Sequence, residues 1–178
     1  FTFNYMRPIE NWGSLAVSFI GTWVDTFKVE PVKGLGTYDC AGYFGPTCSG
    51  VYPDWKHKLQ GVWNSPWNVN AALTWRYVSS VKVDFSSSNP LLAGEYGPAD
   101  NHLASQSYFD LALQWNATKN FTIRGGVNNM FDRDPPIVSS NAGAFPSISG
   151  PALGNGNTYP QAYDTLGRNI FVAVSAKF

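Results

Sequence analysis

The two histidines and two cysteines of this 178-residue chain are the side chains with the widest range of possible chemistry. A hydrolytic site would need a nucleophile, a general base and an orienting group within hydrogen-bond reach of one another. No segment resembles the strand-turn-helix setting that exposes a nucleophilic serine. His57 falls among outward, apolar positions, where we expect a surface imidazole, and His102 falls in a long loop, where it can contact a ligand. The sequence therefore favours a protein that is not an enzyme.

Cys40 and Cys48 lie in the segment YDCAGYFGPTCSG, whose glycines and proline favour turns. Turns of this kind can bring two Cα atoms within disulfide range, and a disulfide indicates an oxidising compartment. The alternatives are two free thiols in a loop or a metal site, and a metal site needs more ligands than this segment offers. We predict a Cys40–Cys48 disulfide, no metal centre and no cofactor.

Charge and aromatic content limit the partners of the chain. Twelve basic and twelve acidic residues leave no excess positive charge for a polyphosphate backbone, so nucleic acid is not an expected partner. Seven Trp, nine Tyr and twelve Phe indicate an apolar–water interface. No apolar run approaches the ~18 residues of a spanning helix, and no signal-peptide pattern follows Phe1. Because Phe1 opens directly in the alternating stretch FTFNY, we interpret the chain as a C-terminal fragment.

Apolar and polar residues alternate with a period of two along most of the chain, which predicts long antiparallel strands. In the stretch 69–85, Leu73 and its apolar neighbours occupy odd positions, while Thr74 and other polar residues occupy even ones. Few strands of soluble proteins are this long. The same pattern predicts further strands over 13–29, 55–63, 109–115, 121–131 and the terminal twelve residues, with a partial strand over 1–5.

The connections between these strands alternate between short and long. Short turns are expected at MRPIENW, SPWN and ATKN, and long loops at 31–54, 86–105 and 135–163. Aromatic residues gather at both ends of the strands, as in outer-membrane barrels with tight turns on one edge and long loops on the other. A soluble β-sandwich also alternates, but its strands average about five or six residues. We therefore predict an all-β, antiparallel transmembrane β-barrel.

Two segments near the end of the chain carry a family resemblance. GVNNMFDRDPPIV follows a V-N-N-L-F-D-x-x-P-P pattern with Met130 in place of Leu, and YDTLGRNIFVAVSAKF follows a final-strand pattern that begins Y-D-x-x-G-R and ends on Phe. Both patterns, in this order, resemble the C-terminus of TonB-dependent outer-membrane receptors, and LAVSFIGTWVDTF and WKHKLQGVWNSPWNVNAALTWRY resemble receptor strands. The motif positions are Asn128, Asn129, Phe131, Asp132, Pro135, Pro136, Tyr163, Asp164, Gly167, Arg168 and Phe178.

The resemblance implies a barrel of about 22 strands closed around an N-terminal plug, with uptake of a scarce ligand driven by TonB and the inner-membrane proton gradient. Residues 1–178 would supply about the last seven strands, as an open curved sheet with edges at 1–5 and 165–178. The expected partners are the remainder of the barrel, its plug, the TonB complex through the absent N-terminal part, the lipid bilayer and a small-molecule ligand. The expected location is the bacterial outer membrane, with long loops extracellular and with short turns and the C-terminus periplasmic.

Candidate functional residues fall into two groups. Charged side chains that we expect to face the lumen, where they pair with the plug or line a ligand path, are Arg76, Lys82, Asp84, Asp110 and Arg124. Loop side chains that we expect to contact a ligand, chiefly by stacking of aromatic rings, are Tyr38, Tyr43, Phe44, Tyr52, Tyr96, His102 and Tyr159.

The leading functional hypothesis is a receptor segment for an iron siderophore, a cobalamin-like molecule or an oligosaccharide. The alternatives are a small passive outer-membrane barrel or adhesin and a soluble carbohydrate-binding β-sandwich. The upstream coding sequence separates these hypotheses. A receptor requires a plug and further strands before Phe1, and a signal peptide directly before Phe1 would exclude the receptor hypothesis.

Overall fold

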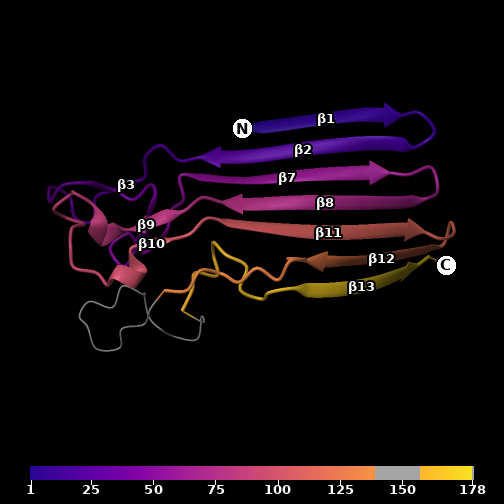
Figure 1. Ribbon diagram of the computed structural model, residues 1–178. Helices are drawn as coiled ribbons and strands as arrows, with labels where there is room; N and C mark the ends of the chain where they lie inside the picture. Colours follow the sequence, from indigo (N-terminus) through magenta and orange to yellow (C-terminus); the bar gives the residue numbers. More distant parts are fainter. Residues whose placement is uncertain (139–156, 178) are drawn as a thin grey trace.

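The computed structural model describes residues 1–138 and 157–177. Its main feature is a seven-stranded antiparallel sheet in the order β1-β2-β7-β8-β11-β12-β13 (Figure 1). Short turns connect the strands at one end of this sheet and long loops connect them at the other, as the sequence predicts. The seven strands are β1 (Thr2–Ile9), β2 (Gly13–Trp23), β7 (Trp55–Asn64), β8 (Val69–Val78), β11 (Gln106–Asn116), β12 (Phe121–Asn128) and β13 (Asn169–Ala176).

The register of these strands gathers the alternating residues onto two different faces. Leu73 lies opposite Gly61 and Leu111, and Thr74 lies opposite Gln60 and Asp110. We call the face of Leu73 the apolar face and the face of Thr74 the polar face. Side chains on the apolar face are open to the surroundings, with Leu73 49% and Val172 76% exposed.

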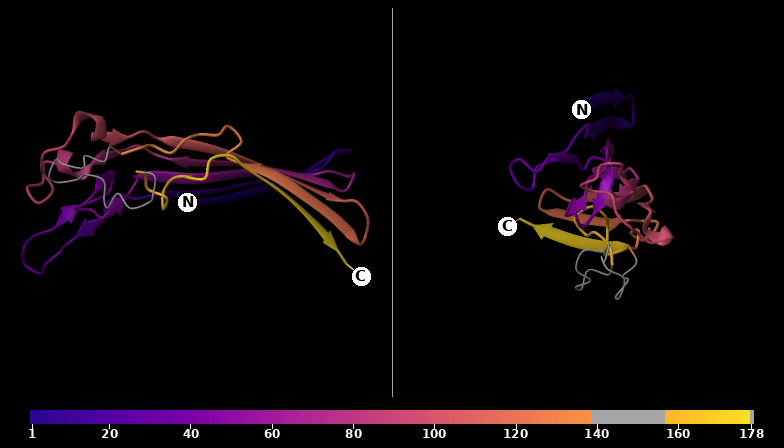
Figure 2. Two further views of the ribbon diagram at one scale, coloured as in Figure 1. Left: turned by 90° about the horizontal axis from the view of Figure 1, so that it is seen from below. Right: turned by 90° about the vertical axis from the view of Figure 1, so that its left-hand side faces the viewer.

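The sheet is curved and open (Figure 2). Its edges are β1 and β13, which do not pair with each other. Phe1 and Gly21 exchange both backbone hydrogen bonds, at 2.7 and 2.8 Å, so the peptide groups of Thr2, Asn4 and Met6 point away from β2. At the other edge the Lys177 N–H donates to the Asn120 carbonyl, and the same alternation turns every second peptide group of β13 outward. The predicted open sheet with two unpaired edges is confirmed.

Four predicted strands are shorter than the sequence pattern indicates, chiefly β2 and β8, and β1, β7 and β11 are longer. β2 ends at Trp23 instead of Val29, and β8 ends at Val78 instead of Phe85. Alternation continues beyond Val78, but the neighbouring strands of the sheet do not, so the next residues pair with other partners. β1 reaches Ile9 through part of the predicted turn MRPIENW.

The long loops build a second, smaller β-structure, which we call the loop cap; it comprises residues 24–54, 79–105, 129–138 and 157–168. A four-stranded sheet in the order β10-β9-β5-β6 and a two-stranded sheet, β3-β4, lie in it. Its elements are β3 (Lys28–Val29), β4 (Tyr38–Asp39), β5 (Tyr43–Gly45), β6 (Gly50–Val51), β9 (Val81–Val83) and β10 (His102–Leu103), with the 3₁₀ helices η1 (Asp84–Ser86) and η2 (Pro98–Asp100).

The two buried hydrophobic clusters of the described residues lie in this loop cap. One cluster contains Phe44, Val81, Val83, Leu103, Val138 and Tyr163, and a second contains Tyr38, Cys40, Cys48 and Leu92. Over residues 1–138 and 157–177, no helix has the length and apolarity needed to cross a membrane.

Candidate functional site

The polar face carries an ion network at the junction with the loop cap. The Arg76 guanidinium on β8 donates from Nε and Nη2 to the two carboxylate oxygens of Asp110, at 2.8 and 3.0 Å, in a bidentate pair. Its Nη2 also donates to Asp164, 2.9 Å away, and the guanidinium lies 5.1 Å from the ring centre of Tyr108. Arg76 therefore ties the segment before β13 to two central strands of the sheet. The sequence placed Arg76 and Asp110 on one face, but the bond to Asp164 depends on tertiary structure.

The motif residues after β12 organise the same junction. The buried Asn129 donates its N–H to Asp110, and its amide group exchanges hydrogen bonds with the backbone of Arg133, which in turn donates from its side chain to Gln106. Asp132 accepts a 2.7 Å hydrogen bond from the Arg168 N–H and lies 3.5 Å from its guanidinium. The two motif segments, far apart in the sequence, thus hold each other in place.

The other motif residues have structural contacts as well. Gly167 adopts a φ of +68°, and a Cβ there would lie 3.1 Å from the Asp132 carboxylate, so a larger residue would strain the contact. Asn128 lies opposite Asn169, Phe131 packs edge-on against Phe109, and the Pro136 carbonyl accepts a hydrogen bond from Thr158. Pro135 precedes this last contact in the chain, and Phe178 lies outside the described residues.

The aromatic loop residues fall into buried and accessible groups. Tyr38 and Phe44 are 6% and 0% exposed, so the prediction that they contact a ligand is wrong. Tyr159 packs edge-on against Phe44, and its buried hydroxyl has no hydrogen-bond partner among the described residues. Burial raises the pKa of Tyr159 to about 12. Tyr38 and Phe44 are buried, and Tyr159 is partly buried, because the long loops pack against one another, which alternation along single strands does not reveal.

The remaining loop candidates keep some access to solvent. Tyr43 and Tyr52 are half-buried, and Tyr52 stacks on Phe27 with 4.4 Å between ring centres. Tyr96 is 40% exposed, and His102 is exposed on β10 with its Nδ1 against Asn101. Tyr43, Tyr52, Tyr96 and His102 therefore stay candidates for ligand contact.

Asp84 and Lys82 belong to the loop cap, and the prediction that they face a lumen is wrong. Asp84 is completely buried, and its Oδ2 accepts hydrogen bonds from the N–H groups of Thr47 and Cys48, at 2.9 and 3.1 Å. Burial raises the pKa of the Asp84 carboxyl above its ordinary value, while these donors act in the opposite direction. Lys82 is exposed on β9, opposite His102. Both predictions failed because β8 ends before it reaches these residues.

The predicted disulfide is confirmed. Cys40 and Cys48 are joined, with their Cα atoms 5.7 Å apart. The same loop supplies the Cys48 N–H to Asp84 and the Thr47 carbonyl to the Tyr38 hydroxyl. The covalent link and the buried carboxylate therefore act on one segment of the loop cap.

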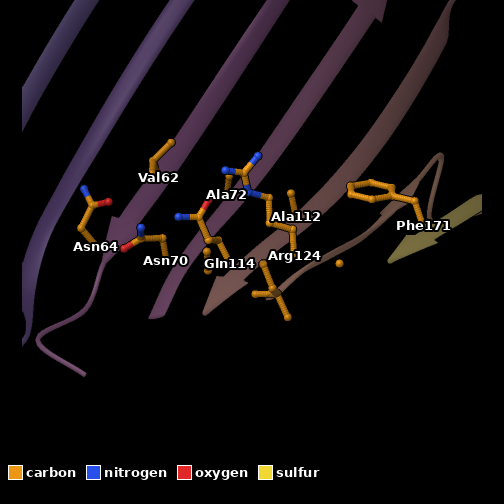
Figure 3. Close-up of a pocket in the computed structure, with 11 residues that line it drawn as sticks. Val62, Asn64, Asn70, Ala72, Ala112, Gln114, Arg124 and Phe171 are labelled. Carbon is orange, nitrogen blue, oxygen red and sulfur yellow. The ribbon is translucent and has the colours of Figure 1, made fainter. Parts of the chain in front are cut away.

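Arg124 lies on the polar face nearer the short turns, in a hollow of about 320 Å³ (Figure 3). Gln114 lies directly opposite Arg124 on the neighbouring strand, and Phe171 borders the hollow from β13. No ion pair to Arg124 occurs within residues 1–138 and 157–177. The register places Arg124 on the polar face, and a lumen-facing position and a partner for it stay predictions.

Phe171 is an apolar exception on the polar face, and the structure explains it. The ring lies over Gly126, where a Cβ would come within 2.6 Å of it. A large ring opposite a glycine fills the space that the missing side chain leaves. The break in alternation at Phe171 was the sequence signal for this contact.

The described parts of the chain contain no group of three or more His, Cys, Asp or Glu side chains arranged to hold a metal ion.

Comparison with solved structures gives matches over nearly the whole chain. The ferric enterobactin receptor of Pseudomonas aeruginosa in complex with BCV-L6 matches with a TM-score of 0.57 and 14% identity, over 99% of this chain and 22% of that chain. A single-residue variant of that receptor in complex with enterobactin matches with a TM-score of 0.56 and 16% identity, over the same shares of the two chains. The chain therefore shares the fold of the matching part of this ferric enterobactin receptor.

The resemblance stated from the sequence motifs is thus confirmed at the level of the fold. The chain spans about a fifth of the length of the receptors that it matches. No protein-family model matches the sequence, and no curated protein matches it either.

Proposed function

We propose that this chain is the C-terminal part of the barrel of an outer-membrane receptor that takes up a scarce ligand by TonB-coupled transport. The observation that carries the proposal is the exposed apolar face of a sheet whose two edges are unpaired. Aromatic side chains occur at both ends of this face, with Trp12 against Trp67 near the short turns and Trp23 against Trp55 near the long loops. Such girdles mark the two interfaces of a bilayer.

The unpaired edges are evidence for further strands of the same barrel on each side of the sheet. An unsatisfied peptide group in hydrocarbon costs several kcal/mol, so a sheet with outward N–H groups along β1 and β13 requires further strands on each side. The rest of the barrel is the partner that we propose for both edges. The soluble β-sandwich would need a second sheet against the apolar face, and residues 1–138 and 157–177 supply none.

The polar face fits the interior of this barrel. It carries Lys56, Lys58, Arg76, Asp110 and Arg124, which a lipid-facing surface does not tolerate. The disulfide lies in the loop cap, in agreement with an extracellular position for the long loops. We propose that the short turns and the C-terminus face the periplasm and that a plug fills the interior.

The ligand classes that we propose are an iron siderophore, a cobalamin-like molecule or an oligosaccharide. The similar receptor of Pseudomonas aeruginosa is described as a ferric enterobactin receptor, which gives the iron chelate first place in the tests. Tyr96 and His102 are the accessible loop residues proposed to contact the ligand.

The proposal is tested with cells that express the complete polypeptide ending in this chain. We expect it in the outer-membrane fraction, with a heat-dependent change of mobility in detergent gels, and we expect uptake of one ligand class that stops when TonB is deleted. The matched control is the same strain with TonB restored. Uptake that continues without TonB would support a passive barrel, and a polypeptide that stays in the soluble fraction would contradict both barrel hypotheses.

A further inference from the structure

A second hollow, of about 290 Å³, lies on the polar face where the sheet meets the loop cap. Four strands and the cap surround it: Thr22 comes from β2, Lys56 and Lys58 from β7, Arg76 from β8, Tyr108 from β11 and Ala162 from the segment before β13. The hollow therefore lies at the long-loop end of the polar face, apart from the hollow around Arg124. We call it the lysine pocket.

The lysine pocket holds more positive charge than the chain neutralises. Lys58 lies directly opposite Arg76 across the β7–β8 pair, and Lys56 is two residues further along the same face of β7. Arg76 engages both neighbouring carboxylates, Asp110 and Asp164. Both lysines are exposed, and neither has an ion pair within the described residues. Like charges directly opposite each other on antiparallel strands are destabilising, so this arrangement favours a bound counter-charge.

The floor of the pocket is fixed while its lysines are free to move. Arg76 is held by three hydrogen bonds to carboxylates and by the ring of Tyr108. The two ammonium groups sit on flexible four-carbon stems, and each offers three donors without a fixed direction. A pocket of this kind can receive an anionic group of varied shape and bring it against a rigid, positively charged wall.

From these contacts we infer that the lysine pocket binds an anionic group of the transported solute, such as a phosphate, a carboxylate or a metal-bound phenolate. The inference rests on the proposed function, because it places the pocket on the ligand's route inside the barrel. It narrows the substrate class to anionic solutes and assigns Lys56 and Lys58 as specificity-determining residues. Arg76 is a positioning residue, since its donors are already engaged.

The test measures binding of inorganic tripolyphosphate, an anion without metal or sugar, to the purified complete polypeptide in detergent. We expect calorimetric binding that weakens as salt is added, because exposed charges are screened. The double variant Lys56→Gln/Lys58→Gln should bind at least tenfold more weakly. Lys119→Gln, at an exposed lysine of the short-turn end, should bind as the unchanged protein does. Unchanged mobility of the variants in detergent gels shows that the barrel has formed.

Two results would overturn the inference. Equal affinity of the double variant and the unchanged protein would remove the lysines from the site. No binding by the unchanged protein, together with a lower melting temperature of the double variant than of Lys119→Gln, would show that an acidic side chain elsewhere in the polypeptide fills the pocket. The outcome is separate from the uptake test, because tripolyphosphate binding is measured without TonB and without transport.

Discussion

The seven-stranded sheet and the loop cap are both β-structures, but apolar side chains are exposed on the sheet and buried in the cap. In the sheet the apolar side chains are the exposed ones, with Val172 76% and Leu73 49% exposed. In the loop cap the apolar side chains lie inside, with Phe44 and Val83 completely buried. The sheet exposes an apolar face and has two unpaired edges, whereas the cap contains its own cores and its own disulfide.

Charged residues follow the same division. The Arg76 network lies on the surface of the sheet and connects it to the cap, where water and further ligands can reach it. Asp84 lies inside the cap and binds backbone N–H groups in place of a cation. Asp110 and Asp84 are the same residue type, but Asp110 pairs with a cation on the sheet and Asp84 accepts from backbone N–H groups in a buried site.

The comparison predicts that a charge on the apolar face harms the sheet most of all. Leu73→Arg should reduce the stability of the complete protein in lipid bilayers by about 2–4 kcal/mol if the site lies near the bilayer midplane. The matched control is Ala72→Arg, the neighbouring residue on the polar face, which borders the hollow around Arg124 and has room for a longer side chain. Denaturant titrations in lipid vesicles measure both. Equal costs would contradict the assignment of the two faces.

Loss of the disulfide should affect the cap alone. In the chain-entropy model a loop closed over a sequence separation of 8 residues is stabilised by about 2–3 kcal/mol. Cys40→Ser/Cys48→Ser should therefore raise hydrogen exchange over residues 38–51 and leave β7, β8 and β11 unchanged. Faster exchange throughout the sheet would show that the two regions unfold as one unit.

Removal of the buried carboxylate should have a smaller effect on the same region. Asp84→Ala leaves the N–H groups of Thr47 and Cys48 without their acceptor, at a cost of about 1–3 kcal/mol. Asp84→Asn keeps an acceptor oxygen and should recover part of the loss. Limited proteolysis within residues 38–54 measures the change, and Lys82→Ala, an exposed neighbour on β9, serves as the control. Cleavage of Asp84→Ala no faster than this control would argue against the anchoring role.

The smallest effect is expected from a buried hydroxyl. Burial raises the pKa of Tyr159 to about 12, so the neutral form is the one that the folded cap favours. The free energy of unfolding of the cap is therefore unaffected by the ionisation of this group below the ordinary tyrosine pKa of about 10, and it falls as the pH rises toward 12 and the hydroxyl ionises in the unfolded chain. Tyr159→Phe should have unchanged stability at neutral pH, because the hydroxyl has no hydrogen-bond partner among the described residues. It should also remove a component near pH 12 from the tyrosinate absorbance titration, and a titration identical to that of the unchanged protein would refute the assignment.

The strands of the sheet, its two faces and its alternation of short and long connections were predictable from the sequence. A strand's side chains alternate with a period of two, and the short turn SPWN sets the register of β7 against β8, so the pairing of Leu73 with Gly61 and of Thr74 with Gln60 follows from local pattern. The disulfide was predictable for the same reason, because Cys40 and Cys48 lie close together in the chain.

The packing of the long loops depends on contacts between segments that lie far apart in the sequence. β5 pairs in parallel with β9, and Asp84 accepts its hydrogen bonds from residues 36 and 37 positions away. Val81 and Val83 alternate as the residues of β8 do, yet they turn inward to a core built by three loops. Alternation with a period of two indicates that one side of a strand is apolar. Whether that side meets lipid or a buried core depends on which segments the folded chain brings against it.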